Sequence, residues 1–183
     1  MAHRLAWVLY ATLALVAPEA GASDKSVQTY MREAGPDAKL VGHGMLKIDG
    51  KSVNCGTRPT VLNPNFNSWA GAFPGFMILN TKKLDGLSTP VKLYLYSHEC
   101  GHQFVGADEV KADFFAIRRG MKLGWLNAQG MKDICTFISK LKATAAHPPG
   151  PARCEMMRKY YRQTAATTNA PSSSKAQTLG PAE

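Results

Sequence analysis

Residues 88–120 read STPVKLYLYSHECGHQFVGADEVKADFFAIRRG, and this stretch predicts two consecutive helices. Ser88 and Thr89 can cap the first helix, and Pro90 suits its first turn, where a missing N–H costs nothing. The helix should run from Val91 to about Val105 and end at Gly106. This first helix carries the residues on which the functional prediction depends.

Asp108 is a natural cap for the second helix, which we expect to continue through Arg119 and to end near Gly120 or Gly124. Apolar residues at helical spacing predict its buried stripe: Val110, Phe114, Ile117 and Met121. Only a short stretch separates the two helices, so they need a tight connection through Gly106.

The flanking sequence predicts an α+β fold, with a small sheet followed by a helical half. Asp49-Gly50 favours a tight turn in a hairpin over residues 39–54. Residues 55–75 are rich in Gly, Pro and Asn and predict a long loop, whereas Phe76–Asn80 predicts a strand. Further helices are expected over residues 24–35, 128–142 and 152–162, the second of these with the stripe Ile134, Phe137, Ile138 and Leu141.

The chain divides into three segments by composition. Residues 1–22 combine a basic head, a short apolar run and the small-x-small pattern Ala20-Gly21-Ala22, which predicts a cleaved signal peptide; an uncleaved N-terminal anchor is the alternative. Residues 23–163 have the size of one domain. Residues 164–183 are small and polar and predict a disordered tail. We therefore expect an exported protein, periplasmic or secreted, with no integral membrane segment after signal cleavage.

The formal net charge is +9, but the basic residues are scattered along the chain. No nucleic-acid motif and no interleaving of aromatic and basic residues accompanies them. This pattern favours a solvated basic surface and argues against a specific nucleic-acid partner. Weak binding of anionic polymers through that surface stays open.

Four cysteines, Cys55, Cys100, Cys135 and Cys154, remain after signal removal. An even number in an exported protein predicts disulfides, and four cysteines allow three pairings. One of these pairings, Cys55–Cys100 with Cys135–Cys154, would tie the first helix of the 88–120 stretch to the loop before it. The spacing lacks any CxxC, which argues against a cysteine zinc cluster.

The run His98-Glu99-Cys100-Gly101-His102 matches the pattern HExxH. His98 and His102 are four residues apart on a predicted helix, so both imidazoles emerge on one face and can bind one zinc ion. Glu99 lies about 100° around the helix from His98, beside the metal rather than on it. It can take a proton from a zinc-activated water and pass it to a leaving amine.

Cys100 lies about 200° around the helix from each histidine, so we expect it in the core rather than on the metal. Three other residues share its side of the helix at helical spacing: Leu93, Tyr96 and Phe104.

A catalytic zinc usually has a third protein ligand and one open position, and three acids follow the histidines. We assign Glu109 as the third ligand and Asp113, one turn later, as the acceptor for the N–H of a zinc histidine. Asp108 is an alternative ligand, as in HExxHxxGxxD, although the glycine stands at 106 rather than 105. A solvated acidic helix face is the other reading of these residues.

HECGH followed by EVKADFFA resembles the HExxH … ExxAD pattern of gluzincin-type metallopeptidases, in particular the HtpX-like and CAAX-prenyl-protease-like group. The resemblance covers roughly residues 76–160 and implies that Glu109 is the third zinc ligand. The group's later HPxxxxR pattern has its counterpart in residues 147–153. The resemblance implies that His147 stabilises the oxyanion and that Arg153 positions it. It also implies that Phe76–Asn80 is an edge strand that binds an extended peptide; an ordinary core strand is the alternative.

The sequence therefore predicts an exported zinc metallopeptidase that acts on a protein or peptide. The alternative is a non-catalytic, disulfide-stapled envelope protein in which zinc is structural or absent. A closed site with four protein ligands would distinguish the second reading from the first.

Overall fold

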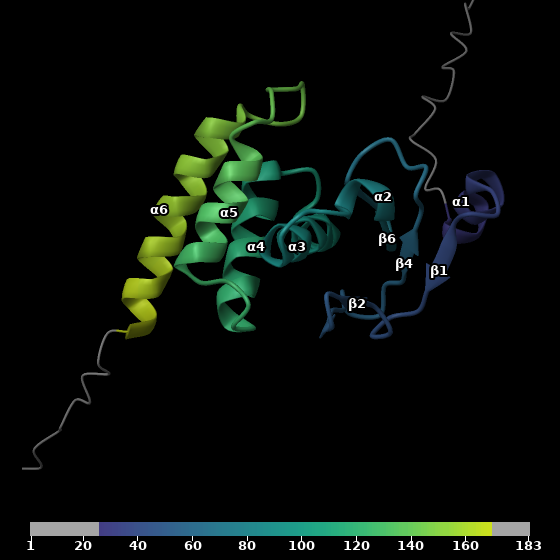
Figure 1. Cartoon of the computed structure of the whole chain (residues 1–183), viewed down its shortest axis with the longest axis horizontal. Helices are drawn as coiled ribbons and strands as arrows, with labels where there is room; N and C mark the ends of the chain where they lie inside the picture. The colour runs from purple at the N-terminus through teal and green to yellow at the C-terminus, as the bar shows by residue number, and fades with distance from the viewer. Residues whose placement is uncertain (1–25, 170–183) are drawn as a thin grey trace, which may run out of the picture.

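The computed structural model describes residues 26–169. The predicted signal peptide and residues 170–183 of the predicted tail lie outside the described residues. Figure 1 shows the strands and helix α1 on one side of the molecule and helices α4, α5 and α6 on the other, with α3 between them. A small sheet region followed by a helical half confirms the predicted α+β class. Within the described residues, no helix has the length and apolar character needed to cross a membrane.

The main sheet has four strands in the order β1-β4-β6-β5, and it differs from the prediction in two ways. Its strands are β1 (Lys39–Val41), β4 (Thr60–Leu62), β5 (Ala70–Phe73) and β6 (Phe76–Leu79). Two of them fall in the predicted loop over residues 55–75. The predicted strand β6 does form, but it lies between β4, to which it is parallel, and β5, to which it is antiparallel. The prediction of an edge strand was therefore wrong for β6, and the edge belongs to β5.

The hairpin is confirmed in its central part. Strands β2 (Lys47–Ile48) and β3 (Lys51–Ser52) pair in antiparallel fashion around Asp49 and Gly50, whose φ angles are 46° and 79°. Both turn residues therefore occupy the left-handed region that a two-residue hairpin turn requires. The first residues of the predicted hairpin instead form β1, which pairs with β4.

The predicted helices begin close to the predicted residues and differ mainly in where they end, and one short helix, α2 (Thr81–Leu84), was not predicted. They are α1 (Val27–Ala34), α2 (Thr81–Leu84), α3 (Thr89–Val105), α4 (Glu109–Lys122), α5 (Ala128–Ile138) and α6 (Gly150–Asn169). Helix α5 is shorter than predicted. Helix α6 is longer and includes residues 164–169, which we had assigned to the tail.

Helices α3 and α4 end and begin at the predicted signals. Pro90 lies in the first turn of α3, and Gly106 ends the helix with a φ of 66°. The side chain of Asp108 accepts a hydrogen bond from the backbone N–H of Lys111 at the start of α4. A positive φ at Gly106 lets the chain reverse within a few residues. The two helices are therefore packed side by side.

Helix α4 packs against α3 through small residues, which contradicts the predicted stripe. Its buried residues are Ala112, Asp113, Ala116, Ile117 and Gly120, so only Ile117 of the predicted four is buried. At the crossing, a Cβ added to Gly101 of α3 would lie 3.1 Å from the Cα of Ala112. This close approach brings the first turns of α4 up to the last turns of α3.

Cys100 is fully buried, as its helical phase predicts, and two disulfides are formed. Their pairs are Cys55–Cys100 and Cys135–Cys154. Phe104 departs from the predicted core side, because 56% of it is exposed. It stacks on Phe115, and the guanidinium of Arg58 lies 4.8 Å above its ring.

Candidate metal centre

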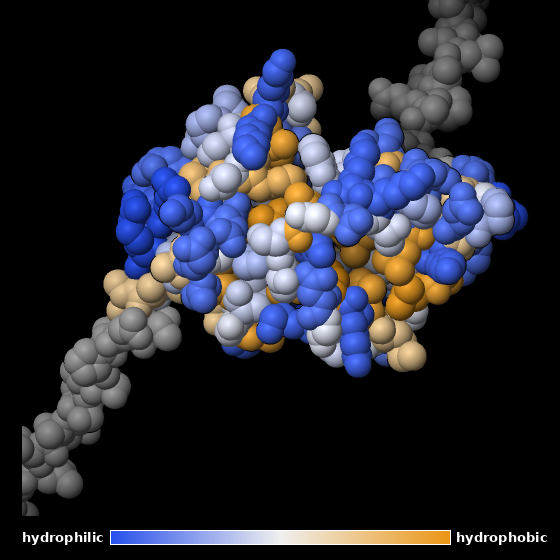
Figure 2. Space-filling view, in the orientation of Figure 1, coloured by the Kyte–Doolittle hydropathy of each residue, from blue (hydrophilic) through white to orange (hydrophobic). Residues whose placement is uncertain are grey.

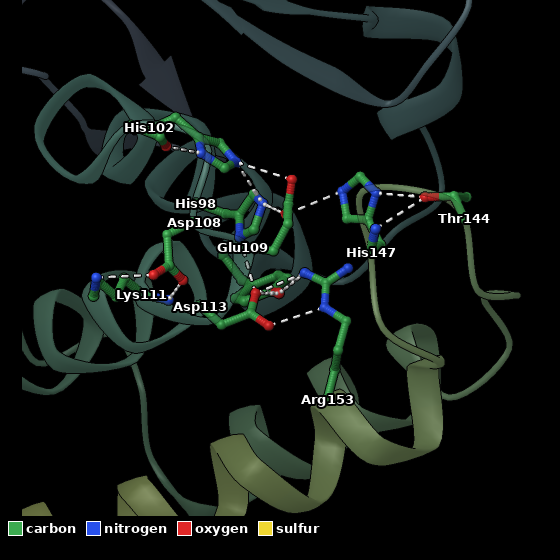
Figure 3. A network of polar contacts seen from close by, with 11 residues as sticks. His98, His102, Asp108, Glu109, Lys111, Asp113, Thr144, His147 and Arg153 are labelled. Atoms are coloured by element: carbon green, nitrogen blue, oxygen red, sulfur yellow. Dashed lines mark hydrogen bonds and ion pairs between the residues drawn. The ribbon is translucent and has the colours of Figure 1, made fainter.

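The metal-ligand atoms that the sequence predicts come together where α3 meets the start of α4. His98 and His102 are one turn apart on α3, and Glu109 is the first residue of α4. One ligand atom from each of these three residues lies within 4.8 Å of the others. Figure 3 shows both rings and the Glu109 carboxylate pointing toward one another. This group could hold a metal ion.

His98 is buried, with 4% of its surface exposed. Its Nδ1 lies 2.9 Å from Oδ1 of Asp113, and its Nε2 lies 3.1 Å from Oε2 of Glu109. The Nδ1 contact is not aligned as a hydrogen bond. A carboxylate oxygen at this distance nevertheless favours a proton on Nδ1, because a carboxylate can only accept. The neutral ring then presents the lone pair of Nε2 to the cluster.

His102 has the same orientation for a different reason. Its Nδ1 lies 2.7 Å from the carbonyl oxygen of Gly106, so Nδ1 must carry the proton and donate it. Its Nε2 lies 3.1 Å from Nε2 of His98 and 3.6 Å from Oε1 of Glu109. The chain reversal at Gly106 therefore fixes the tautomer of this histidine.

When both histidines are neutral, the three ligand atoms that meet in the cluster can accept hydrogen bonds but cannot donate them. Two imidazole lone pairs and one carboxylate face the same point, and such groups repel one another unless a cation lies between them. Oε2 of Glu109 is buried and, among the described residues, has no contact aligned as a hydrogen bond. A metal ion would supply the missing positive charge, so the residues fit a metal.

When no metal is bound, protons on the histidines can supply the positive charge between the ligand atoms. Burial alone would lower the pKa of His98, but the carboxylates of Asp113 and Glu109 outweigh it and raise the pKa to about 9. Burial likewise opposes ionisation of Glu109, yet the nearby rings of His102 and His98 hold its pKa far below its ordinary value. Metal and proton therefore compete for the same lone pairs.

Asp113 is held from three sides and is 1% exposed. Arg153 of α6 donates from Nε to Oδ2 at 2.9 Å and from Nη2 to Oδ1 at 2.7 Å. The Tyr94 hydroxyl donates to Oδ1 at 2.5 Å. Burial alone would raise the pKa of Asp113, but His98 and Arg153 lower it to about 2. The carboxylate is therefore a fixed, ionised support for His98.

Arg153 has a different role from the predicted one. Its hydrogen bonds go to Asp113 and Tyr94, so it orients His98 through Asp113 and does not hold His147 (Figure 3). His147 is held by Thr144, whose hydroxyl lies 3.0 Å from Nδ1. Nε2 of His147 faces Glu109 and lies 3.1 Å from Oε2. The structure therefore brings His147 to the cluster from the segment between α5 and α6.

Glu99 lies beside the cluster and reaches the cavities next to it. Burial raises the pKa of its carboxyl group more than the neighbouring His98 and His102 lower it. Asp108, by contrast, lies on the surface, where it caps α4 and pairs with Lys111 at 2.9 Å. Asp108 does not belong to the cluster, so the alternative ligand assignment was wrong.

Models of protein families, curated proteins and solved structures gave no match to the chain. What can be said of function therefore depends on the geometry of the cluster and its surroundings.

An open trough of about 760 Å³ leads to the cluster along strand β5. Its wall includes residues 70–75, and its floor includes Glu99, His102 and Glu109. Gln103 of α3 donates to the carbonyl oxygen of Phe73 at 2.8 Å and accepts from the backbone N–H of Gly75 at 3.0 Å. The Gln103 side chain therefore holds the end of β5 against α3.

The sequence analysis missed three supporting residues. Tyr94 lies one turn before His98 on α3, so its i, i+4 spacing was a readable signal. Gln103 and Thr144 had no such signal, because their partners lie in a turn and in a non-helical segment. Only the fold places them at the site.

Proposed function

We propose that this protein is a zinc-dependent peptidase of the gluzincin type, related in its site to the HtpX-like and CAAX-prenyl-protease-like group. The observation that carries the proposal is the convergence of the His98, His102 and Glu109 ligand atoms, with the Nδ1 contact of each histidine favouring the tautomer that binds metal. Two imidazoles and one carboxylate are a ligand set of catalytic zinc sites that keep one position open.

Glu99 is the proposed general base. A zinc ion held by His98, His102 and Glu109 would act as a Lewis acid and make water acidic near neutral pH. Glu99 would hold the proton lost by the attacking water and donate it to the leaving amine. The raised pKa of its carboxyl group brings it closer to the operating pH than that of an ordinary glutamate, which suits a group that must both accept and donate.

The surroundings support a peptide as substrate. Strand β5 is an edge of the sheet and lies along the trough, so the backbone on its outer side can pair with an extended peptide. His147 lies across the cluster from α3, where its Nε2–H can stabilise the charge on the carbonyl oxygen of the bond being cut. The Glu109 oxygen 3.1 Å from Nε2 can only accept, which favours a proton on Nε2, and the Thr144 hydroxyl then donates to Nδ1.

We propose that the protein acts outside the cytoplasm, in the periplasm or as a secreted enzyme. Two disulfides support this location, because such bonds persist in oxidising compartments and are rare in reducing ones.

One observation favours the alternative of a structural zinc. Nε2 of His147 lies 3.1 Å from the Glu109 oxygen that faces the cluster, so His147 is near enough to become a fourth ligand. A site closed in this way has no position for water. The two readings predict different results for His147→Ala. A catalytic site keeps its zinc affinity and loses turnover, whereas a structural site loses zinc.

The test of the proposed function compares Glu99→Gln with the wild-type protein. We expect zinc in near-stoichiometric amount in both, with cleavage of a peptide library only by the wild type. Glu155→Gln makes the same chemical change on the exposed face of α6 and should cleave as the wild type does. Cleavage by Glu99→Gln at the wild-type rate would refute the proposal, as would a folded, active protein without metal.

A further inference from the structure

A second cavity opens beside the cluster on the side away from the end of β5. Its volume is about 350 Å³, and it is lined by residues from α3, α5, the segment after α5 and the residues before β5. Ligand pockets for small molecules span roughly 300–1,000 Å³, so this cavity suits one side chain rather than a length of peptide. Its lining also includes His98, Glu99 and His147, so the cavity opens directly onto the cluster.

The walls of the cavity are mainly apolar. They include Trp69, Leu95, Phe137, Ile138 and Leu141. Trp69 and Phe137 meet edge to face, with ring centroids 5.3 Å apart. This pairing joins the strand side of the cavity to α5.

The cavity meets the trough at the proposed catalytic groups. Four residues line both spaces: Ser68, Ala70, Glu99 and His147. A peptide that lies in the trough along β5, with its scissile bond at Glu99, therefore directs a neighbouring side chain into the second cavity. Apolar surface is visible between the helical side and the sheet side of the molecule in Figure 2, whereas the outer side of α6 is hydrophilic.

The polar groups of the cavity select against a basic side chain. The Tyr94 hydroxyl and two nitrogens of Arg153 are already bonded to Asp113 or to each other. The positive charge of Arg153 is paired with Asp113, and exposed Lys142 brings a further positive charge to a lining that also includes Glu99. A lysine or arginine side chain would meet the charge of Lys142, and any charged side chain would lose its water against the apolar walls.

We propose that this cavity is the specificity pocket of the enzyme, and that it binds a large apolar side chain, such as leucine, methionine or phenylalanine, next to the bond that is cut. The inference rests on the proposed peptidase function for its meaning, but the binding of an apolar side chain is measurable without any cleavage.

The first experiment measures binding alone. N-acetyl-phenylalaninamide is titrated into the full-length protein, and the methyl resonances of Ile138 and Leu141 are followed by NMR. We expect both to shift, and N-acetyl-glycinamide at the same concentration to leave them unchanged. Leu141→Trp, which fills the cavity, should abolish the shift at Ile138. Leu123→Trp is the matched control, since Leu123 is exposed at the far end of α4 and should leave the shift intact.

The second experiment measures cleavage of peptides that differ at one position. We expect Leu141→Trp to lower kcat/KM for the phenylalanine peptide about ten-fold more than for the alanine peptide, because pockets discriminate such differences by roughly 10–200-fold. Lys142→Glu changes only an exposed charge and should raise cleavage of a lysine peptide relative to a leucine peptide.

The outcomes separate the two proposals. If N-acetyl-phenylalaninamide shifts neither methyl, the specificity pocket is refuted whatever the enzyme cuts. Glu99-dependent cleavage with no preference, or with a preference for acidic side chains, also refutes it. If the ligand binds but no peptide is cut in a Glu99-dependent way, the proposed peptidase function fails and the apolar binding site stands.

Discussion

Replacing Asp113 by asparagine is the sharpest test of how the metal centre is supported. The change keeps the size of the side chain but removes a charge that faces His98, Arg153 and Tyr94. Buried Arg153 would then lack its counter-ion, and His98 would lose the acceptor that favours a proton on Nδ1. We expect a lower stability without metal and a lower affinity for zinc.

The magnitude follows from the contacts of the carboxylate. The pKa of Asp113 lies at about 2, against 3.8 for an ordinary aspartate. This difference corresponds to about 2.5 kcal/mol of stability, at about 1.4 kcal/mol per pH unit. Because the pKa is lowered, the contribution is complete above pH 3.8 and is lost as the pH falls toward 2. Removing one partner of a buried ion pair costs about 3–5 kcal/mol, so both approaches give a loss of about 3 kcal/mol at pH 7.

The assay has two readouts and one control. Urea denaturation of the metal-free, disulfide-intact protein gives the loss of stability, and competition with a chelator gives the zinc affinity, which should fall about 10–100-fold. Asp108→Asn is the matched control, because asparagine caps a helix as well as aspartate does and Asp108 lies on the surface. If Asp113→Asn behaves like Asp108→Asn in both readouts, the proposed support of His98 is wrong.

Three further predictions follow from the same structure. Because the pKa of His98 is about 9 without metal, zinc must displace a proton at pH 7. Calorimetry of zinc binding in buffers of different ionisation heat should detect the released proton. In the metal-free protein, the stability contributed by protonated His98 should be complete below pH 6.5 and disappear as the pH rises through 9. Gly101→Ala places a Cβ 3.1 Å from the Cα of Ala112 and should lower the free energy of unfolding, measured by urea denaturation, by about 1–3 kcal/mol. It should also weaken zinc binding, because α4 and its Glu109 would move away from α3. Reduction of the disulfides, which close sequence separations of 45 and 19 residues, should remove about 4 and about 3 kcal/mol respectively, and an unchanged melting temperature in reductant would contradict this.

Helical periodicity predicted the parts of the structure that depend on one helix at a time. The i, i+4 spacing of His98 and His102 and the phase of Cys100 follow from 100° per residue, and the structure has both as expected. The capping signals at Pro90, Gly106 and Asp108 were also sufficient to locate the ends of α3 and the start of α4. Local rules sufficed because each of these features involves neighbours in sequence.

The sheet could not be predicted in the same way. Strand β5 has the sequence AGAF, too short and too rich in small residues to show alternation, and β4 has only three residues. Both strands form by pairing with β6, and a single sequence does not show which segments pair. The edge that lines the trough was therefore assigned to the wrong strand, although it lies just before β6 in the chain.

The error on α4 explains how the short connection between the helices can work. We expected its large apolar residues to be buried, but Phe114 instead stacks on Tyr160 of α6, with ring centroids 4.4 Å apart. The face toward α3 is made of small residues, and small residues let two helix backbones come close. Only six residues separate His102 from Glu109, so wide spacing between the helices would leave the carboxylate out of reach. Three features therefore act together to bring Glu109 to the histidines: the contact of Gly101 with Ala112, the chain reversal at Gly106 and the short connection. A larger side chain at the Gly101 contact should separate the three ligands before it unfolds the protein.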